Sequence, residues 1–276
     1  MFYYFNSEMK YWEKPFAPDP VLNNNSWEDI QRAAQEGIAS TTWNVGDRKE
    51  IILNGTCRAR TFNNYKVYAY ILGFNHNAQL EGNNTIHFQI GFDALSGGNH
   101  IALTDWTHSD PYGAASGTRF CMNDTQTNVG GWNGSLMRTT TIPEFINCLP
   151  SDLQDALKAV NKYTDNGTGS THESSADVTA TQDKVFLLAE YEIFGSIKYA
   201  NPYEQNSQAQ YDYYKNGNSK AMYNDQRTGY AASWWERSAY SSNTERFCMM
   251  YSPNGGSENR AYSYYSYGFA PAFVVG

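Results

Sequence analysis

The chain has 276 residues, of which 41% are hydrophobic and only 17% charged, and its formal net charge at pH 7 is −8. Such a composition is typical of a folded protein with one large or two smaller domains, and it excludes a disordered chain. No cluster of Lys and Arg is dense enough to follow a phosphate backbone, so we expect no nucleic-acid partner. We also expect no secretory signal and no membrane insertion, because the first twenty residues lack a basic region and every apolar run is short.

Residues 1–25 have the character of an aromatic arm. Aromatic side chains are frequent there, and Pro15, Pro18 and Pro20 disfavour both a helix and a central strand. Such a segment is expected to pack against its own domain or against a neighbouring subunit, and the sequence leaves both alternatives open.

Residues 26–130 are predicted to form a small β-rich N-terminal part. It opens with a short helix that Ser26 caps and Gly37 ends. The alternating segments 65–74 and 83–92 predict strands. Asn54 and Gly55 are typical of a hairpin turn between two strands.

A long loop is predicted at residues 93–131. It contains Asp105, His108 and Asp110, which invite a metal site. Their spacing matches no standard site, so a solvated loop is the favoured interpretation.

Residues 131–276 are predicted to form a second part. The segment 132–163 has helical features: Pro143 suits a first helical turn, Ser151 and Gln154 match a capping box, and Val160 belongs to an apolar stripe. An exposed loop is predicted at 164–182 and a Tyr-rich insertion at 198–230. Between them, a buried strand at 185–188 runs into a helical turn.

The last 44 residues combine a framework with a surface. Trp234, Trp235, Phe269 and Phe273 are large apolar framework residues, whereas Tyr, Ser, Asn and Gly dominate the positions between. These four residue types supply rigid contact area and adaptable hydrogen bonds in binding surfaces. Ordinary β-proteins also carry Tyr-rich strands, so a structural role is the alternative. The predicted ligand-binding residues are Tyr240, Ser242, Asn243, Asn259, Tyr262, Tyr264, Tyr265 and Tyr267.

Chemistry-bearing motifs are weak in this sequence. No nucleophile elbow, dinucleotide-binding, phosphate-binding loop or zinc-protease pattern occurs, and the five histidines are scattered. Glu236 and Arg237, set among apolar residues, favour a buried ion pair over catalysis. The four cysteines form no CxxC pair, so we expect free, mostly buried thiols. We therefore expect no enzyme activity, no metal and no cofactor.

Several short blocks resemble the DUF6273 family, found in gut bacteria and their phages. They cover residues 26–276 and are WE (27–28), VGDRK (45–49), GFNH (73–76), TNVGGW (127–132), MRT (137–139), LPS (149–151), DKVFLL (183–188), EIFG (192–195), WWERS (234–238) and GFAPAF (268–273).

The WWERS and GFAPAF blocks also resemble the C-terminal framework of the C-type-lectin-like fold in the formylglycine-generating-enzyme style. Target proteins of diversity-generating retroelements use that fold, and the resemblance implies a variable region at 240–267. The catalytic branch needs a reactive cysteine pair, whereas Cys248 stands alone in this region, and no lectin calcium motif is present.

Together these features predict an α+β protein with short helices and an irregular antiparallel sheet. The expected function is ligand or receptor binding by a phage-encoded, adhesin-like protein on the virion surface. Its expected partners are a host-surface protein or glycan, other virion subunits and further copies of itself. The alternatives are a structural tail or capsid-decoration subunit without diversification and, less favoured, an unfamiliar enzyme.

Overall fold

The computed structural model describes residues 4–6, 11–13, 16–105, 119–227 and 229–276. The strands, in chain order, are β1 (Tyr4–Asn6), β2 (Tyr11–Glu13), β3 (Arg48–Cys57), β4 (Arg60–Phe74), β5 (Ile86–Phe92), β6 (Ile101–Ala102), β7 (Val160–Asp165), β8 (Val178–Asp183), β9 (Val185–Phe186), β10 (Tyr223–Asn224), β11 (Trp234–Ala239), β12 (Arg246–Tyr251), β13 (Ser257–Tyr262) and β14 (Ala272–Val275).

The helices are short. They are α1 (Trp27–Gln35), α2 (Ala39–Thr42), α3 (Ala78–Glu81), α4 (Gly131–Gly134), α5 (Ile142–Ile146), α6 (Ser151–Ala156), α7 (Glu190–Phe194) and α8 (Asp212–Lys215). Single turns of 3₁₀ helix occur at η1 (Leu22–Asn24), η3 (Ser175–Asp177), η4 (Pro202–Asn206) and η5 (Ser252–Asn254), and η2 (Met137–Thr141) is a π-helical turn that runs into α5.

The helix predicted after Ser26 is confirmed as α1. The Ser26 hydroxyl accepts a hydrogen bond from the Asp29 N–H at 3.0 Å, and the Asp29 carboxylate accepts one from the Ser26 N–H, which forms a capping box. Gly37 follows the helix with φ +73°, a conformation that favours glycine. Trp27 and Ile30 form its buried face.

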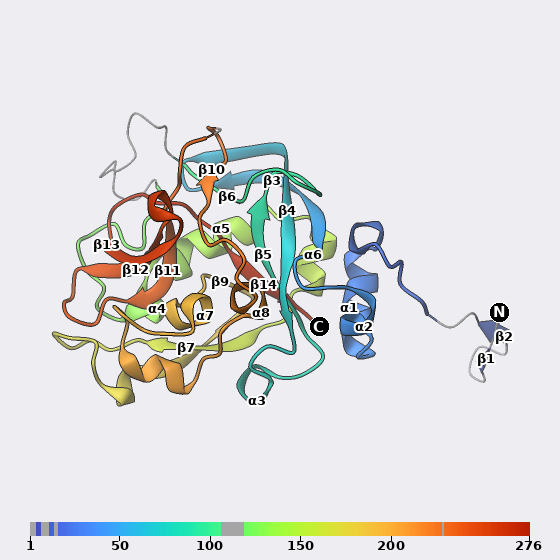
Figure 1. The fold of residues 1–276 in the computed structure, drawn as a ribbon, viewed down its shortest axis with the longest axis horizontal. Coiled ribbons are helices and arrows are strands. Elements are labelled where there is room, and N and C mark those ends of the chain that lie inside the picture. The colour runs from blue at the N-terminus through green and yellow to red at the C-terminus, as the bar shows by residue number, and fades with distance from the viewer. Residues whose placement is uncertain (1–3, 7–10, 14–15, 106–118, 228) are drawn as a thin grey trace.

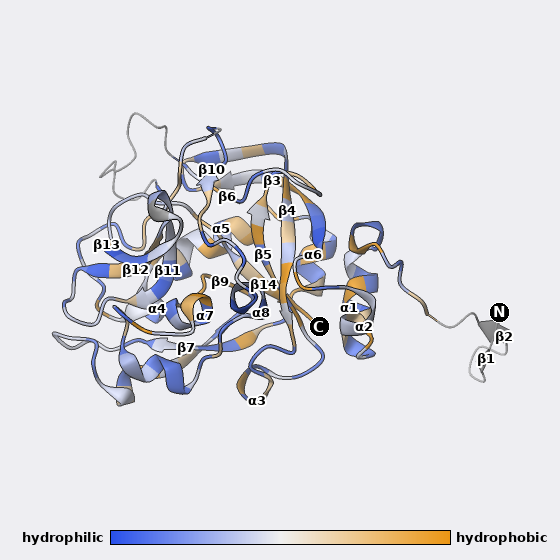
Figure 2. Ribbon diagram, in the orientation of Figure 1, coloured by the Kyte–Doolittle hydropathy of each residue, from blue (hydrophilic) through white to orange (hydrophobic). Residues whose placement is uncertain are grey.

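The core is a five-stranded antiparallel sheet in the order β3-β4-β5-β14-β9 (Figure 1). All seven residues of β5 are buried, so both faces of the sheet are covered there. On one face, the Trp27 ring meets Phe88 and Phe273 edge-on, at 5.5 and 5.7 Å between centroids. On β4, the ring centroid of Tyr70 lies 4.5 Å from that of Tyr213 in α8. Figure 2 shows hydrophobic residues concentrated at β5 and β14.

A second, three-stranded sheet carries the predicted binding region. Its order is β11-β12-β13, which leaves β13 as an edge strand, and it lies on the side of the molecule opposite α1 (Figure 1). Isolated bridges between Trp234 and Gly268 and between Leu103 and Phe269 tie this region to the segment that enters β14. The second sheet is therefore anchored to the core through the GFAPAF block.

The predicted turn at Asn54 and Gly55 is wrong. Both residues lie inside β3, where the pairing with β4 shifts register between Leu53 and Gly55, and the turn falls at Arg58. Gly55 has φ +126°, and a Cβ there would lie 3.2 Å from the Cys148 sulfur. The glycine therefore serves a bulge and a close approach rather than a hairpin turn.

The predictions for 132–182 are partly wrong. Val160 begins a strand instead of ending a helical stripe, and β7 pairs with β8 through the segment predicted to be a loop. Helix α6 begins after Pro150, and Gln154 donates to the Leu149 carbonyl instead of forming a capping box. Pro143 in the first turn of α5, the strand at β9 and the helical turn at α7 are confirmed.

The predicted α+β class, with short helices and an antiparallel sheet, is confirmed. The predicted division at residues 130/131 stays a prediction, although β14 from the second part inserts between β5 and β9 in one sheet. Residues 1–3, 7–10 and 14–15 of the predicted aromatic arm lie outside the described residues. Among the residues that are described, no helix has the length and apolar character needed to cross a membrane.

Candidate functional site

The second sheet presents one face built from alternating residues of β12 and β13. Arg246 lies opposite Tyr262, and Cys248 lies opposite Arg260. Because successive side chains of a strand point to opposite faces, these four residues share one face. Asn259, between Arg260 and Glu258, belongs to the other face. The sheet therefore separates Asn259 from Tyr262, the predicted tyrosine of its own strand.

Four of the predicted tyrosines form one interlocked cluster. Tyr262 stacks on Tyr264 at 6.0 Å, Tyr265 meets Tyr264 edge-on at 4.8 Å, and Tyr265 lies 6.4 Å from Tyr267. All four are half-buried. Tyr267 also packs edge-on against Trp235 of the framework, at 5.0 Å. The cluster is thus a rigid aromatic surface supported from below, as the edge-to-face preference of such rings favours.

Tyr240 lies apart from these four and has a neighbour that sequence reasoning missed. Its ring meets Tyr199 edge-on at 5.9 Å, and the Tyr199 carbonyl accepts a hydrogen bond from Ser241 N–H at 2.8 Å. The beginning of the Tyr-rich insertion 198–230 therefore lies beside the predicted face. No local pattern in the sequence pairs Tyr199 with Tyr240.

Two arginines, also missed from the sequence, lie between the tyrosines. The Arg246 guanidinium carbon lies 4.4 Å from the Tyr262 ring centroid, and that of Arg260 lies 4.7 Å from the Tyr199 ring. Arg260 is also 5.7 Å from the Tyr240 ring. Stacking on aromatic rings is a usual environment for guanidinium groups at binding sites.

The turn at 240–246, which holds Ser242 exposed and Asn243 half-buried, is clamped from below by Asn128. The Asn128 side-chain amide donates to the carbonyls of Tyr240, Asn243 and Arg246 at 3.2, 2.9 and 2.6 Å, and its backbone N–H donates to the Thr244 carbonyl. Asn128 is completely buried. It belongs to the TNVGGW block, and its side chain fixes the shape of the turn.

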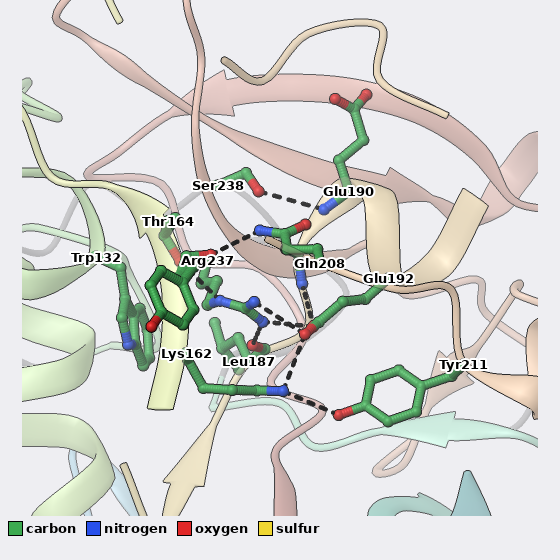
Figure 3. A network of polar contacts seen from close by, with 12 residues as sticks. Trp132, Lys162, Thr164, Leu187, Glu190, Glu192, Gln208, Tyr211, Arg237 and Ser238 are labelled. Carbon is green, nitrogen blue, oxygen red and sulfur yellow. Dashed lines mark hydrogen bonds and ion pairs between the residues drawn. The ribbon is translucent and has the colours of Figure 1, made fainter. Parts of the chain in front are cut away.

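Beneath the sheet, a buried charge network joins β11 to α7, β7 and α3 (Figure 3). The Arg237 guanidinium donates to both carboxylate oxygens of Glu192 in α7, at 2.5 and 2.9 Å. The Lys162 ammonium of β7 lies 2.9 Å from Glu192 and 2.7 Å from Glu81. Burial alone raises the pKa of Glu192, but Arg237 and Lys162 outweigh it and hold this pKa below its ordinary value.

The predicted ion pair between Glu236 and Arg237 is therefore wrong. Neighbouring residues of a strand point to opposite faces, so Arg237 reaches Glu192 while Glu236 points away from it. Glu236 is completely buried, and neither of its carboxylate oxygens has a hydrogen-bond partner among the described residues. Burial, with Glu190, Glu258 and Glu204 nearby, raises the pKa of Glu236 well above its ordinary value.

One group of described residues has metal-ligand character. Ligand atoms of His76, Glu81 and Glu192 lie within 4.8 Å of one another. The Lys162 ammonium contacts both glutamates at ion-pair distance. This ammonium supplies the positive charge that a metal would supply, so the group is best described as a structural ion cluster. Of the three loop residues considered as metal ligands from the sequence, Asp105 accepts a hydrogen bond from the Ser266 hydroxyl, and His108 and Asp110 lie outside the described residues.

The cysteine prediction is confirmed: Cys57, Cys121, Cys148 and Cys248 are free and buried. Burial raises the pKa of Cys121 to about 11 and that of Cys248 well above its ordinary value. Such thiols carry little thiolate at neutral pH and are inert packing residues.

These features define an α+β protein that presents an aromatic surface on a small antiparallel sheet. The family model of DUF6273, a domain of unknown function, matches residues 115–276, so the chain belongs to that family. The match includes the turn at 240–246, the tyrosine cluster and, of the charge network, Lys162, Glu192 and Arg237, whereas Glu81 lies outside it. Neither the curated proteins nor the solved structures contain a match to this chain.

Proposed function

We propose that this chain is a ligand-binding protein of the adhesin type. The observation that carries the proposal is the tyrosine cluster of residues 262, 264, 265 and 267, whose half-buried rings brace one another and rest on Trp235. Rigid, amphipathic rings lose little conformational entropy when a ligand binds, which is why tyrosine is favoured in binding surfaces.

The division between framework and surface supports a face that tolerates sequence change. Trp234, Trp235 and Phe269 are completely buried, whereas the tyrosines and Ser242 reach solvent. Tyr265 and Tyr267 also pack against the core, but substitution of Ser242, Tyr262 or Tyr264 removes little core packing, so these positions can vary while the fold persists. In this proposal the chain is a C-type-lectin-like, phage-encoded virion protein whose residues 240–267 are diversified to bind a host-surface protein or glycan.

The test is made first on the gene. The locus is sequenced in many related isolates and searched for a neighbouring reverse transcriptase and a template copy of its 3′ end. Substitutions confined to codons 240–267, with Trp234, Phe269 and Phe273 unchanged, are the expected result. An invariant region with no template copy overturns the diversified form of the proposal.

The second candidate is a structural virion subunit. The hairpin of β1 and β2 lies apart from the rest of the molecule in Figure 1, and an isolated two-stranded hairpin is marginally stable without a partner. Removal of residues 1–25 distinguishes the two candidates. A structural subunit then fails to assemble, whereas a binding protein keeps its ligand.

A further inference from the structure

Three cations lie along the tyrosine-bearing face, and we call them the basic strip: Lys198, Arg246 and Arg260. The Lys198 ammonium lies 5.1 Å from the Tyr199 ring, and Arg260 lies over the same ring at 4.7 Å. Arg246 lies diagonally across the strand pair from Arg260, on the same face. The strip therefore runs from the start of the Tyr-rich insertion to the tyrosine cluster.

The guanidinium groups of the strip are not neutralised by the protein. Among the described residues, Arg246 and Arg260 form no ion pair. Within the described part of the chain, the Arg246 side chain makes no hydrogen bond, and that of Arg260 makes one, to Asn259 Oδ1 at 3.3 Å. The Nε atoms of both arginines are buried without an acceptor. This is unusual in a chain with 28 acidic and 20 basic residues, where carboxylates are plentiful.

The nearest carboxylates do not cancel the strip. Glu190 is completely buried, and its oxygens accept hydrogen bonds from the backbone N–H groups of residues 198–200 at 2.8–3.2 Å. Glu245 directly precedes β12 and Glu258 lies in β13, but neither forms an ion pair with Arg246 or Arg260. The two guanidinium groups are consequently held in position by aromatic rings, with donors left over.

The geometry points to an acidic glycan as the ligand of this face, with carboxylate or sulfate groups on Arg246 and Arg260 and sugar rings on the adjacent tyrosines. This inference rests on the proposed binding function. A planar guanidinium matches the two oxygens of a carboxylate or sulfate, and these charge-assisted hydrogen bonds are stronger than neutral ones. The apolar face of a sugar ring packs on the face of a tyrosine, whose hydroxyl can hydrogen-bond a neighbouring sugar hydroxyl.

The test is calorimetric titration of the full chain with three size-matched probes: a heparin hexasaccharide, a hexagalacturonate and neutral maltohexaose. The variants are Arg246→Gln and Arg260→Gln. Lys215→Gln is the control. Lys215 is exposed on α8, so this substitution removes one positive charge from the surface of another element. Thermal midpoints show whether each variant is folded. Should a glutamine variant be unfolded, Arg246→Lys and Arg260→Lys replace it, since lysine keeps the charge and loses the planar fork.

The two acidic probes are expected to bind, and maltohexaose is not. Tighter binding of the heparin hexasaccharide would indicate sulfate as the preferred group, and tighter binding of the hexagalacturonate would indicate carboxylate. Each Arg→Gln change is expected to weaken binding by about tenfold, and each Arg→Lys change by less. Lys215→Gln leaves affinity unchanged, and added salt weakens binding. Equal binding of maltohexaose, or arginine variants that bind like the wild type, overturns the inference.

The inference and the proposed function fail in different ways. A further variant, Tyr262→Ser combined with Tyr264→Ser, reports on the surface itself. If maltohexaose binds the wild type but not this double variant, the proposed binding surface is supported and the inference of an acidic ligand is refuted. If no probe binds and the gene shows no diversified codons, both fall.

Discussion

The imidazole of His172 is hydrogen-bonded to the Asn128 side chain, with 3.0 Å between Nε2 and Oδ1. The other ring nitrogen, Nδ1, lies 2.7 Å from the Asp165 carboxylate, which also accepts the Gly167 N–H. The orientation of the Asn128 amide is settled, because its nitrogen faces three backbone carbonyls. The His172 ring therefore bridges the Asn128 side chain and the Asp165 carboxylate, and it fixes the position of the Asn128 amide. A buried chain of hydrogen bonds thus supports the residue that shapes the turn at 240–246.

Asn128→Ala is expected to destabilise the protein by about 2–4 kcal/mol, because it leaves several buried donors and acceptors unpaired. The loss is expected to be local as well, so amide hydrogens of residues 240–246 exchange faster at constant temperature. Urea unfolding and hydrogen exchange measure the two effects. Asn216→Ala is the control, since Asn216 is exposed at the end of α8. Unchanged exchange in 240–246 contradicts the role given to Asn128.

Glu236→Gln is expected to stabilise the protein, and more so at higher pH. The folded-state pKa of Glu236 lies well above its ordinary value, mainly through burial. The protonated carboxyl is tolerated in the fold, so stability is lost as pH rises from the unfolded pKa, near 4.3, through the folded pKa. Glutamine carries no charge, so the variant does not lose stability in this way. At pH 8 its free energy of unfolding is expected to exceed that of the wild type by at least about 1 kcal/mol.

Urea unfolding from pH 4 to pH 9 measures that difference. Glu173→Gln is the matched control, because Glu173 is exposed. A difference between Glu236→Gln and the wild type that does not grow with pH contradicts the assignment of a buried, unpartnered carboxyl.

Glu192→Gln is expected to cost about 3–5 kcal/mol, because it leaves the buried charges of Arg237 and Lys162 without their shared carboxylate. The free energy of unfolding in urea measures this loss. Glu36→Gln is the control, since Glu36 pairs with Arg32 on the exposed side of α1 and such surface pairs contribute little. Equal, small effects of the two changes would show that the network does not hold β7, α7 and β11 together.

Trp235→Ala and Tyr264→Ala are expected to separate framework from surface. Trp235 is completely buried and donates to the Phe120 carbonyl at 3.0 Å, so its truncation costs about 3–5 kcal/mol. Tyr264 is half-buried at the surface, so its truncation leaves the thermal midpoint close to that of the wild type while ligand binding falls. A large fall in the midpoint for Tyr264→Ala would make the tyrosine cluster part of the core.

Local features of the fold followed from local sequence signals. The Ser26 cap and the alternating strands β4 and β5 depend on neighbouring residues, whose propensities and periodicity can be read directly from the sequence. The predictions for Asn54–Gly55 and for Val160 were wrong because contacts from distant segments decided them. Cys148 approaches Gly55, and β8 provides the partner strand that draws Val160 out of a helix.

The sequence by itself determined the class of the fold and the apolar framework, because burial preference is a property of single positions. The eight residues expected to bind a ligand stay a prediction. Only the tertiary structure decided which charges meet. Arg237 reaches Glu192 across 45 residues, Asn128 reaches the turn at 240–246, and Arg260 meets Tyr199. Such pairings arise when packing of the core brings separate segments together, and the energy of a charge or a ring depends on that neighbour rather than on its position in the chain.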